Sequence, residues 1–150
     1  MKEVTDVTII STNLNKKILD KYQDYSLIED NFTYEELLKK KKVIFFNVLN
    51  NLSDEELKKI FDYVKKNNIL FINVTNEIEL SLYTNYLIIY DKENILIEGS
   101  TIEVLKNEKL LKRLGLQLPF MVELSLLLKD YGLIDEIYLE KERLVDKLWK

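Results

Sequence analysis

The chain has 150 residues, of which 47% are hydrophobic and 32% charged, so it is long enough to bury the core of one domain. It contains neither Cys nor His, which excludes disulfides, thiol nucleophiles, the usual zinc sites and a histidine general base. With a net charge of -4, nothing in the composition argues for a nucleic-acid or anionic-membrane partner, and we expect no nucleic acid. The N-terminal sequence predicts no signal peptide, and no stretch approaches the ~20 apolar residues of a membrane span. We therefore expect a soluble, cytoplasmic protein.

Short apolar runs rich in Ile, Val, Phe and Tyr alternate with helical patterns, which predicts an α/β fold. The expected strands run over residues 7–11, 25–29, 43–49, 69–74 and 86–90. An amphipathic segment near residues 14–22 and a short helix near 76–82 stand between strands. Thr33 and Ser53 each precede a glutamate by three residues, the capping-box pattern that begins a helix.

The segment after residue 90 predicts a hairpin and then a helical region. The four residues DKEN link YLIIY to ILIEG, and so short a link joins only antiparallel strands. The helical pattern that follows is interrupted at Gly115, Pro119 and Gly132. We expect a three-layer sandwich whose mostly parallel sheet has about five strands and an edge hairpin. The predicted division is a core over residues 1–106 and a helical extension over 107–150.

The C-terminal half carries a family resemblance in one unbroken register from Tyr86 to the end of the chain. The matching segments are TNYLIIYDKENILIEGSTIEVL, then LGLQLP at residues 114–119, VELS at 122–125 and ERLVDKLW at 142–149. This sequence resembles the ATP-binding subunits of ABC transporters, in particular those of the energy-coupling factor (ECF) type. The resemblance implies a P-loop NTPase-like fold. It also implies a shortened core that lacks the helical and antiparallel subdomains of the family.

The resemblance also locates the catalytic positions, and they are altered. Residues 43–46 form the apolar run that the family ends with Asp-Glu, where the Asp binds magnesium and the Glu polarises the attacking water. Here Asn47 and Val48 follow. The switch histidine of the family corresponds to Asn76. Neither an amide nor an aliphatic side chain performs the original chemistry.

The phosphate-loop position is altered too. It runs from Ser11 through Asn13 to Lys16 and Lys17, and the chain has no glycine before Gly99 to let a backbone curl round phosphates. We therefore expect no ATP hydrolysis, no cofactor and no metal. A solvated first helical turn is the favoured interpretation of both lysines.

Other polar groups also have simpler interpretations. Asn47, Asn50 and Asn51 follow a strand at the sheet edge where α/β proteins bind ligands, and they could hold a small polar molecule there. Asn is also a common turn and cap residue, and that interpretation is favoured. The acidic residues 54–56 fit the first turn of a helix because its dipole favours negative charge. The lysines at 39–42 fit a solvent-facing run before a buried strand.

Two hypotheses follow. The first is a non-catalytic pseudo-ATPase that acts by protein contact, as a homodimer or docked on a transporter ATPase subunit. In the ECF family the C-terminal extension contributes to contacts between ATPase subunits, so the predicted interaction residues are Leu116, Pro119, Phe120, Leu124, Tyr138, Leu144, Leu148 and Trp149. For Tyr138 and Trp149, ordinary helix packing is an equal alternative. The second hypothesis is a small-molecule or nucleotide-binding domain that does not hydrolyse its ligand and is unrelated to transport.

Overall fold

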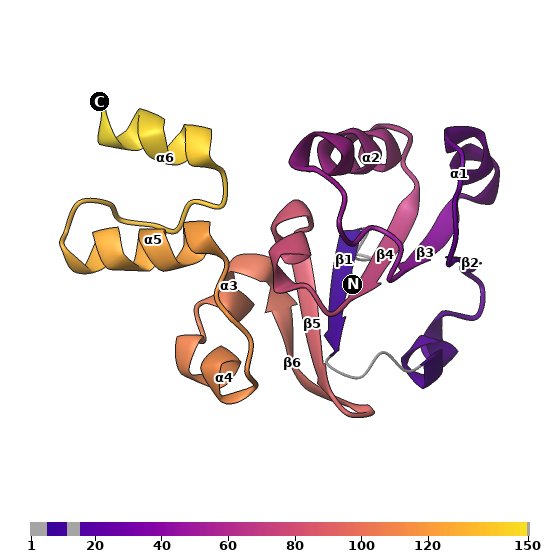
Figure 1. The fold of residues 1–150 in the computed structure, drawn as a ribbon, viewed down its shortest axis with the longest axis horizontal. Helices are drawn as coiled ribbons and strands as arrows, with labels where there is room; N and C mark the ends of the chain where they lie inside the picture. The colour runs from indigo at the N-terminus through magenta and orange to yellow at the C-terminus, as the bar shows by residue number, and fades with distance from the viewer. Residues whose placement is uncertain (1–5, 12–15, 150) are drawn as a thin grey trace. The chain divides into compact units, whose positions relative to one another are not determined.

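The computed structural model describes residues 6–11 and 16–149 (Figure 1). The chain divides into two compact units, Met1–Thr101 and Ile102–Lys150. The first unit contains the sheet and the second consists of short helices. The division falls before the boundary that the sequence pattern placed after residue 106.

The first unit is built on one six-stranded sheet, in the order β2-β3-β4-β1-β5-β6. Its strands are β1 (Asp6–Ser11), β2 (Ser26–Ile28), β3 (Lys42–Phe46), β4 (Leu70–Thr75), β5 (Tyr86–Asp91) and β6 (Asn94–Ser100). Strands β1 to β5 pair with one another in parallel, and β6 is antiparallel to β5 at the edge. The predicted α/β class, the mostly parallel sheet and the edge hairpin are therefore confirmed.

Several predicted boundaries were wrong. Strand β3 stops at Phe46, three residues early, because Asn47 takes a left-handed φ of 54° that turns the chain out of the sheet. The Asn47 N–H then donates to the carbonyl of Val74 at 2.8 Å. The amphipathic segment near residues 14–22 is a 3-10 helix, η1 (Lys16–Tyr22), and β2 keeps only three residues of the predicted strand.

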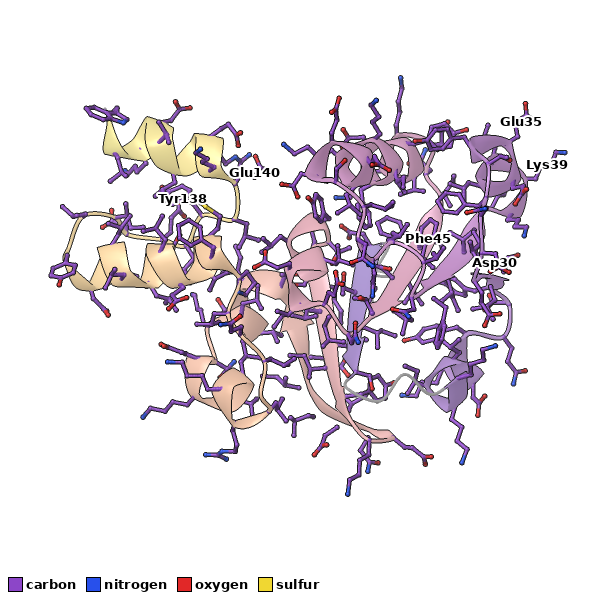
Figure 2. All side chains as sticks on the ribbon, viewed as in Figure 1. Asp30, Glu35, Lys39, Phe45, Tyr138 and Glu140 are labelled. Atoms are coloured by element: carbon purple, nitrogen blue, oxygen red, sulfur yellow. The ribbon has the colours of Figure 1, made fainter. Side chains whose placement is uncertain are left out.

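One face of the sheet packs against α1 (Tyr34–Lys40), α2 (Asp54–Lys66) and the 3-10 helix η2 (Ile78–Tyr83). Both predicted helix starts are confirmed, since the Glu36 and Glu56 N–H groups donate to the hydroxyls of the N-cap residues Thr33 and Ser53 at 3.2 Å each. Phe45 points from β3 toward the helices, while Glu35 and Lys39 point outward from α1 (Figure 2). The buried core on this face comprises Ile28, Leu37, Val43, Phe45, Leu49, Leu57, Ile60, Phe61, Val64, Ile69, Phe71 and Leu80.

The opposite face packs against η1 and completes three layers. Because side chains alternate along a strand, Ile44 lies in this second core while its neighbours Val43 and Phe45 lie in the first. Tyr22 of η1 is half-buried against this face. The second core comprises Val7, Ile9, Ile18, Ile44, Ile72, Val74, Ile88 and Tyr90.

The helices after the sheet are α3 (Thr101–Leu105), α4 (Glu108–Arg113), α5 (Phe120–Asp130) and α6 (Lys141–Leu148). Gly115 and Gly132 have φ of 77° and 74° and end α4 and α5. After α4 the Gly115 N–H donates to Lys112 O at 3.0 Å and the Leu116 N–H to Leu111 O at 2.9 Å, which is a Schellman motif. The interruptions of the helical pattern expected at these glycines are therefore left-handed helix caps.

Candidate functional site

Four polar side chains meet beyond the carboxyl ends of β3 and β4, and we call this group the amide network: Asn47, Asn50, Thr75 and Asn76. Asn50 is its centre. Its Nδ2 donates to Asn47 Oδ1 at 2.6 Å and to Asn76 Oδ1 at 3.3 Å, and its Oδ1 accepts from Thr75 Oγ1 at 2.7 Å. The Thr75 hydroxyl in turn accepts the Glu77 N–H at 3.1 Å. The network therefore links the ends of β3 and β4 through side-chain hydrogen bonds.

The chemistry of the amide network is that of neutral groups. None of its four members carries a carboxylate, so the network supplies neither a general base nor the anionic oxygens that Mg²⁺ favours. Within the described residues, no group of three or more His, Cys, Asp or Glu side chains is placed to hold a metal ion. The structure thus brings Asn47 and Asn76 together and bridges them through Asn50.

The remaining residues beside the strand ends have structural roles. Val48 is half-buried and packs on the core beneath α1 and α2, which accounts for an aliphatic side chain there. Asn51 has a left-handed φ of 68° and is exposed, as expected of a turn residue. The Thr75 contribution was missed, because the sequence gives no sign that its hydroxyl turns back on Asn50.

The two lysines at the position expected for a phosphate loop, Lys16 and Lys17, form exposed ion pairs. Lys16 pairs with Glu29, and its Nζ also lies 6.0 Å from the centroid of the Phe46 ring. Lys17 Nζ lies 3.3 Å from a Glu93 carboxylate oxygen. Asn13 lies outside the described residues. Ser11, the last residue of β1, is buried.

The sequence reading missed a buried polar residue in β4. Asn73 is fully buried, and neither atom of its amide has a hydrogen-bond partner within the described part of the chain. It faces Thr8 and Phe45 on the flanking strands. In the sequence, Asn73 is a single polar residue within the apolar run ILFINV. Periodicity and strand propensity predict a strand there whether or not one residue is polar, so they do not single it out.

Tyr83 and Asp54 form a second contact that the sequence did not reveal. The Tyr83 hydroxyl donates to Asp54 Oδ1 at 2.8 Å, and its ring stacks on Phe61 with a centroid distance of 5.2 Å. Burial, followed by the hydrogen bond to Asp54, raises the pKa of Tyr83 above its ordinary value. This contact ties η2 to the first turn of α2.

The predicted interaction residues of α5 and α6 fall into two groups. Phe120 and Trp149 are 69% and 84% exposed, and Leu148 is exposed as well. Pro119 and Leu144 are buried, so they belong to the interior rather than to a free surface.

Leu116, Leu124 and Tyr138 are half-buried. Tyr138 lies between α5 and α6 (Figure 2), and its backbone N–H donates to Ser125 Oγ at 3.1 Å. Its carbonyl accepts from the same Ser125 hydroxyl at 3.2 Å. Other exposed apolar side chains of these helices were not foreseen: Leu127, Tyr131, Leu133 and Val145.

The fold and the polar strand ends define an α/β protein with a parallel core and a neutral network at the edge where such sheets bind ligands. Comparison with known proteins finds sequence similarity over part of the chain. No protein-family model matches. The energy-coupling factor transporter ATP-binding protein EcfA1 of Lactobacillus delbrueckii subsp. bulgaricus is 36% identical over 66 residues, which is 43% of this chain and 23% of that protein.

Two further proteins give the same result. EcfA1 of Bacillus subtilis is 47% identical over 53 residues, covering 35% of this chain and 19% of that protein. A putative ABC transporter ATP-binding protein of Pyrococcus horikoshii is 29% identical over 66 residues, covering 44% and 23%. The resemblance to ECF and ABC transporter ATP-binding proteins is thus confirmed over part of the chain, and the match spans less than a quarter of each relative.

Among solved structures, cbiO1 from Clostridium perfringens, described as part of the ABC transporter complex cbiONQ, aligns with a TM-score of 0.40. It is 19% identical over 53% of this chain and 34% of that one. In the described part of this chain, no helix has the length and apolar character that a membrane crossing requires.

Proposed function

We propose that this chain is a non-catalytic pseudo-ATPase that works by protein contact through α5 and α6. The observation that carries the proposal is the exposed apolar surface on these helices. Phe120, Leu124, Leu127 and Tyr131 recur at the spacing of one helix face, and Phe120 and Tyr131 are 69% and 75% exposed. Exposed aromatic residues gathered on one element favour an interaction site.

The second helix, α6, also exposes apolar side chains. Val145, Leu148 and Trp149 of the α6 region are all exposed, and Trp149 is 84% exposed. Trp and Tyr are the residues that most often dominate the binding free energy of interfaces. We propose a second copy of this chain or a transporter ATPase subunit as the partner, with no role for nucleic acid, and the cytoplasm as the compartment.

The proposed loss of catalysis draws support from the amide network. The network places neutral side chains at Asn47 and Asn76, where the resemblance implies a metal carboxylate and a switch histidine. Lys16 and Lys17, the cationic groups of the loop position, pair with Glu29 and Glu93.

Light scattering and native mass spectrometry test the contact, first with the chain alone and then with a purified ECF-type ATPase subunit. We expect a dimer or a hetero-complex that Phe120→Ala and Trp149→Ala each weaken by about tenfold or more, as truncation of an interface hot spot does. Leu38→Ala is the matched control, because Leu38 is an exposed apolar residue on α1 and should leave assembly unchanged. A chain that stays monomeric and does not bind the ATPase subunit refutes the proposed contact.

Calorimetry with ATP, ADP and GTP, with and without Mg²⁺, tests the alternative of a nucleotide-binding domain. We expect no binding, because the charge-neutralising and metal-holding groups are missing together. Micromolar, Mg²⁺-dependent binding of any of the three nucleotides would establish the alternative and overturn the pseudo-ATPase assignment.

A further inference from the structure

We propose that the corner of the chain after α5 docks into a cavity on a second copy of this chain. The inference rests on the proposed function, because the corner belongs to the α5 surface, and it names the partner and the place of contact. The α5 corner comprises Leu127, Tyr131 and Leu133. The cavity lies at the amino-terminal ends of β1 and β4, has a volume of about 200 Å³ and is lined by Asp6, Lys65, Asn68, Ile69, Leu70, Phe71 and Asn85.

The α5 corner is a Schellman motif whose apolar side chains stay open to solvent. The Leu133 N–H donates to Leu128 O at 2.9 Å, past the left-handed Gly132. In this motif the residue after the glycine ordinarily packs on the last turn of its own helix. After α4, Leu116 in the same position is half-buried, whereas Leu133 is 59% and Tyr131 75% exposed. The α5 corner therefore presents apolar side chains that its own helix does not cover.

Acidic side chains surround the α5 corner. The segment KDYGLIDE, residues 129–136, has one lysine against two aspartates and one glutamate, so its net charge is -2. Asp130 and Asp135 are exposed, and neither forms an ion pair with another described residue. An apolar group with acidic neighbours fits a pocket that has an apolar wall and a basic rim, because each charge then meets its opposite when the apolar group is buried.

The wall and the volume of the cavity suit one aromatic side chain. Ile69 and Phe71 are buried apolar residues, and Leu70 between them is half-buried. An engineered cavity of ~150 Å³ holds benzene, so a volume of about 200 Å³ accommodates the phenol ring of Tyr131. Asn68 also lines the cavity and offers an amide to the tyrosine hydroxyl, which needs a hydrogen-bond partner when it is buried.

The rim of the cavity is basic. The Leu70 N–H donates to the Lys41 carbonyl at 2.9 Å, which places Lys41 beside the lining, and Lys66 follows Lys65 of the lining at the end of α2. Lys41 and Lys66 are exposed, and neither forms an ion pair within the described part of the chain. Asp6 does not offset them, because it already pairs with Lys65, whose Nζ lies 3.7 Å from its Oδ2. The rim is therefore complementary in charge to the α5 corner of a second copy.

Photo-crosslinking from position 131 tests the contact. A ¹⁵N-labelled full chain that carries p-benzoylphenylalanine in place of Tyr131 is mixed with the unlabelled wild-type chain, so that mass spectrometry separates cross-links between copies from those within one copy. We expect cross-links between copies to Lys41 and residues 65–71. Cross-links between copies that reach only α5 and α6 would overturn this inference and leave the proposed function standing. Absence of cross-links between copies, or a link to the cavity within one copy, would also overturn it.

An exchange of charges tests the complementarity. The double variants Asp130→Lys with Asp135→Lys, and Lys41→Glu with Lys66→Glu, should each self-associate at least about tenfold more weakly in light scattering, because like charges then face each other. An equimolar mixture of the two should recover the association of the wild type. Asp20→Lys, which reverses an exposed charge on η1, is the control and should leave association unchanged, with circular dichroism confirming that every variant is folded. Unaltered association of either double variant, or a mixture that does not recover, would refute the inference even if variants elsewhere on α5 and α6 weaken assembly.

Discussion

Replacing Asn73 by valine should make the protein more stable, although the change lies in the centre of the sheet. The amide of Asn73 is fully buried, and neither of its polar atoms has a hydrogen-bond partner among the described residues. A polar group in that position loses its bonds to water on folding and gains nothing in return. Valine removes the amide and is among the side chains best suited to a strand.

The size of the gain follows from the cost of an unsatisfied group, which is about 1–3 kcal/mol. Valine is larger than asparagine, and its methyl groups must fit beside Thr8 and Phe45 on the flanking strands. Overpacking of this kind costs about 1 kcal/mol at its mild end, so we expect a net increase of up to about 2 kcal/mol in the free energy of unfolding.

Urea denaturation followed by circular dichroism measures this change, and the m-value should be unaltered because the same surface is exposed. Asn94→Val on the exposed strand β6 is the control, with an expected change within about 0.5 kcal/mol. A loss of more than about 1 kcal/mol in Asn73→Val would refute the reasoning. It would mean that the amide has a partner after all, such as a buried water molecule.

Three further predictions concern local contacts. Ser53→Ala should lower the free energy of unfolding by about 1 kcal/mol in urea denaturation, because it removes the N-cap of α2; an unchanged midpoint would contradict this cap energy. Thr75→Val should lower the free energy of unfolding by about 1–2 kcal/mol in the same assay, because Asn50 Oδ1 loses the donor that lies 2.7 Å away. An unchanged free energy of unfolding would show that water replaces the hydroxyl. The Tyr83 pKa is raised in the folded state, so its contribution is fully present below the unfolded pKa of about 10 and is lost as pH rises through the folded value. Tyr83→Phe should therefore flatten the alkaline fall in stability, and identical wild-type and variant profiles from about pH 9 to about pH 11.5 would exclude a role for the Asp54 contact.

The sequence predicted most of the sheet, because strands such as β4 and β5 are continuous apolar runs that only a doubly covered parallel sheet accommodates. It also located the starts of α1 and α2, since Thr33 and Ser53 satisfy N–H groups within three residues of themselves. These features depend on neighbours along the chain. For the same reason the interruptions of the helical pattern at Gly115 and Gly132 were recognisable from single residues, although their left-handed φ came only from the structure.

Features that depend on distant parts of the chain were not predictable in this way. The contact between Thr75 and Asn50 joins residues 25 positions apart, and the bond from Asn85 to Asp6 spans 79. Burial of Leu144 and exposure of Tyr131 depend on how the short C-terminal helices pack, because each helix has apolar residues on more than one side. Sequence periodicity alone therefore did not separate the interior of these helices from their surface.

Introducing the two carboxylates of the family's catalytic pair should not produce ATP hydrolysis. The double change Asn47→Asp with Val48→Glu introduces the two carboxylates that the family resemblance implies. A carboxylate oxygen in place of Asn47 Oδ1 still accepts from Asn50 Nδ2, so the network geometry tolerates the first change. Magnesium-dependent phosphate binding also needs a loop whose N–H groups and lysine surround the phosphates. The loop position lacks glycine, and Lys16 and Lys17 are paired with carboxylates. We therefore expect phosphate release from ATP at the rate of the protein-free control, with circular dichroism confirming that the variant is folded. Magnesium-dependent hydrolysis above that control would show that the proposed loss of function lies in two side chains rather than in the whole phosphate-binding frame.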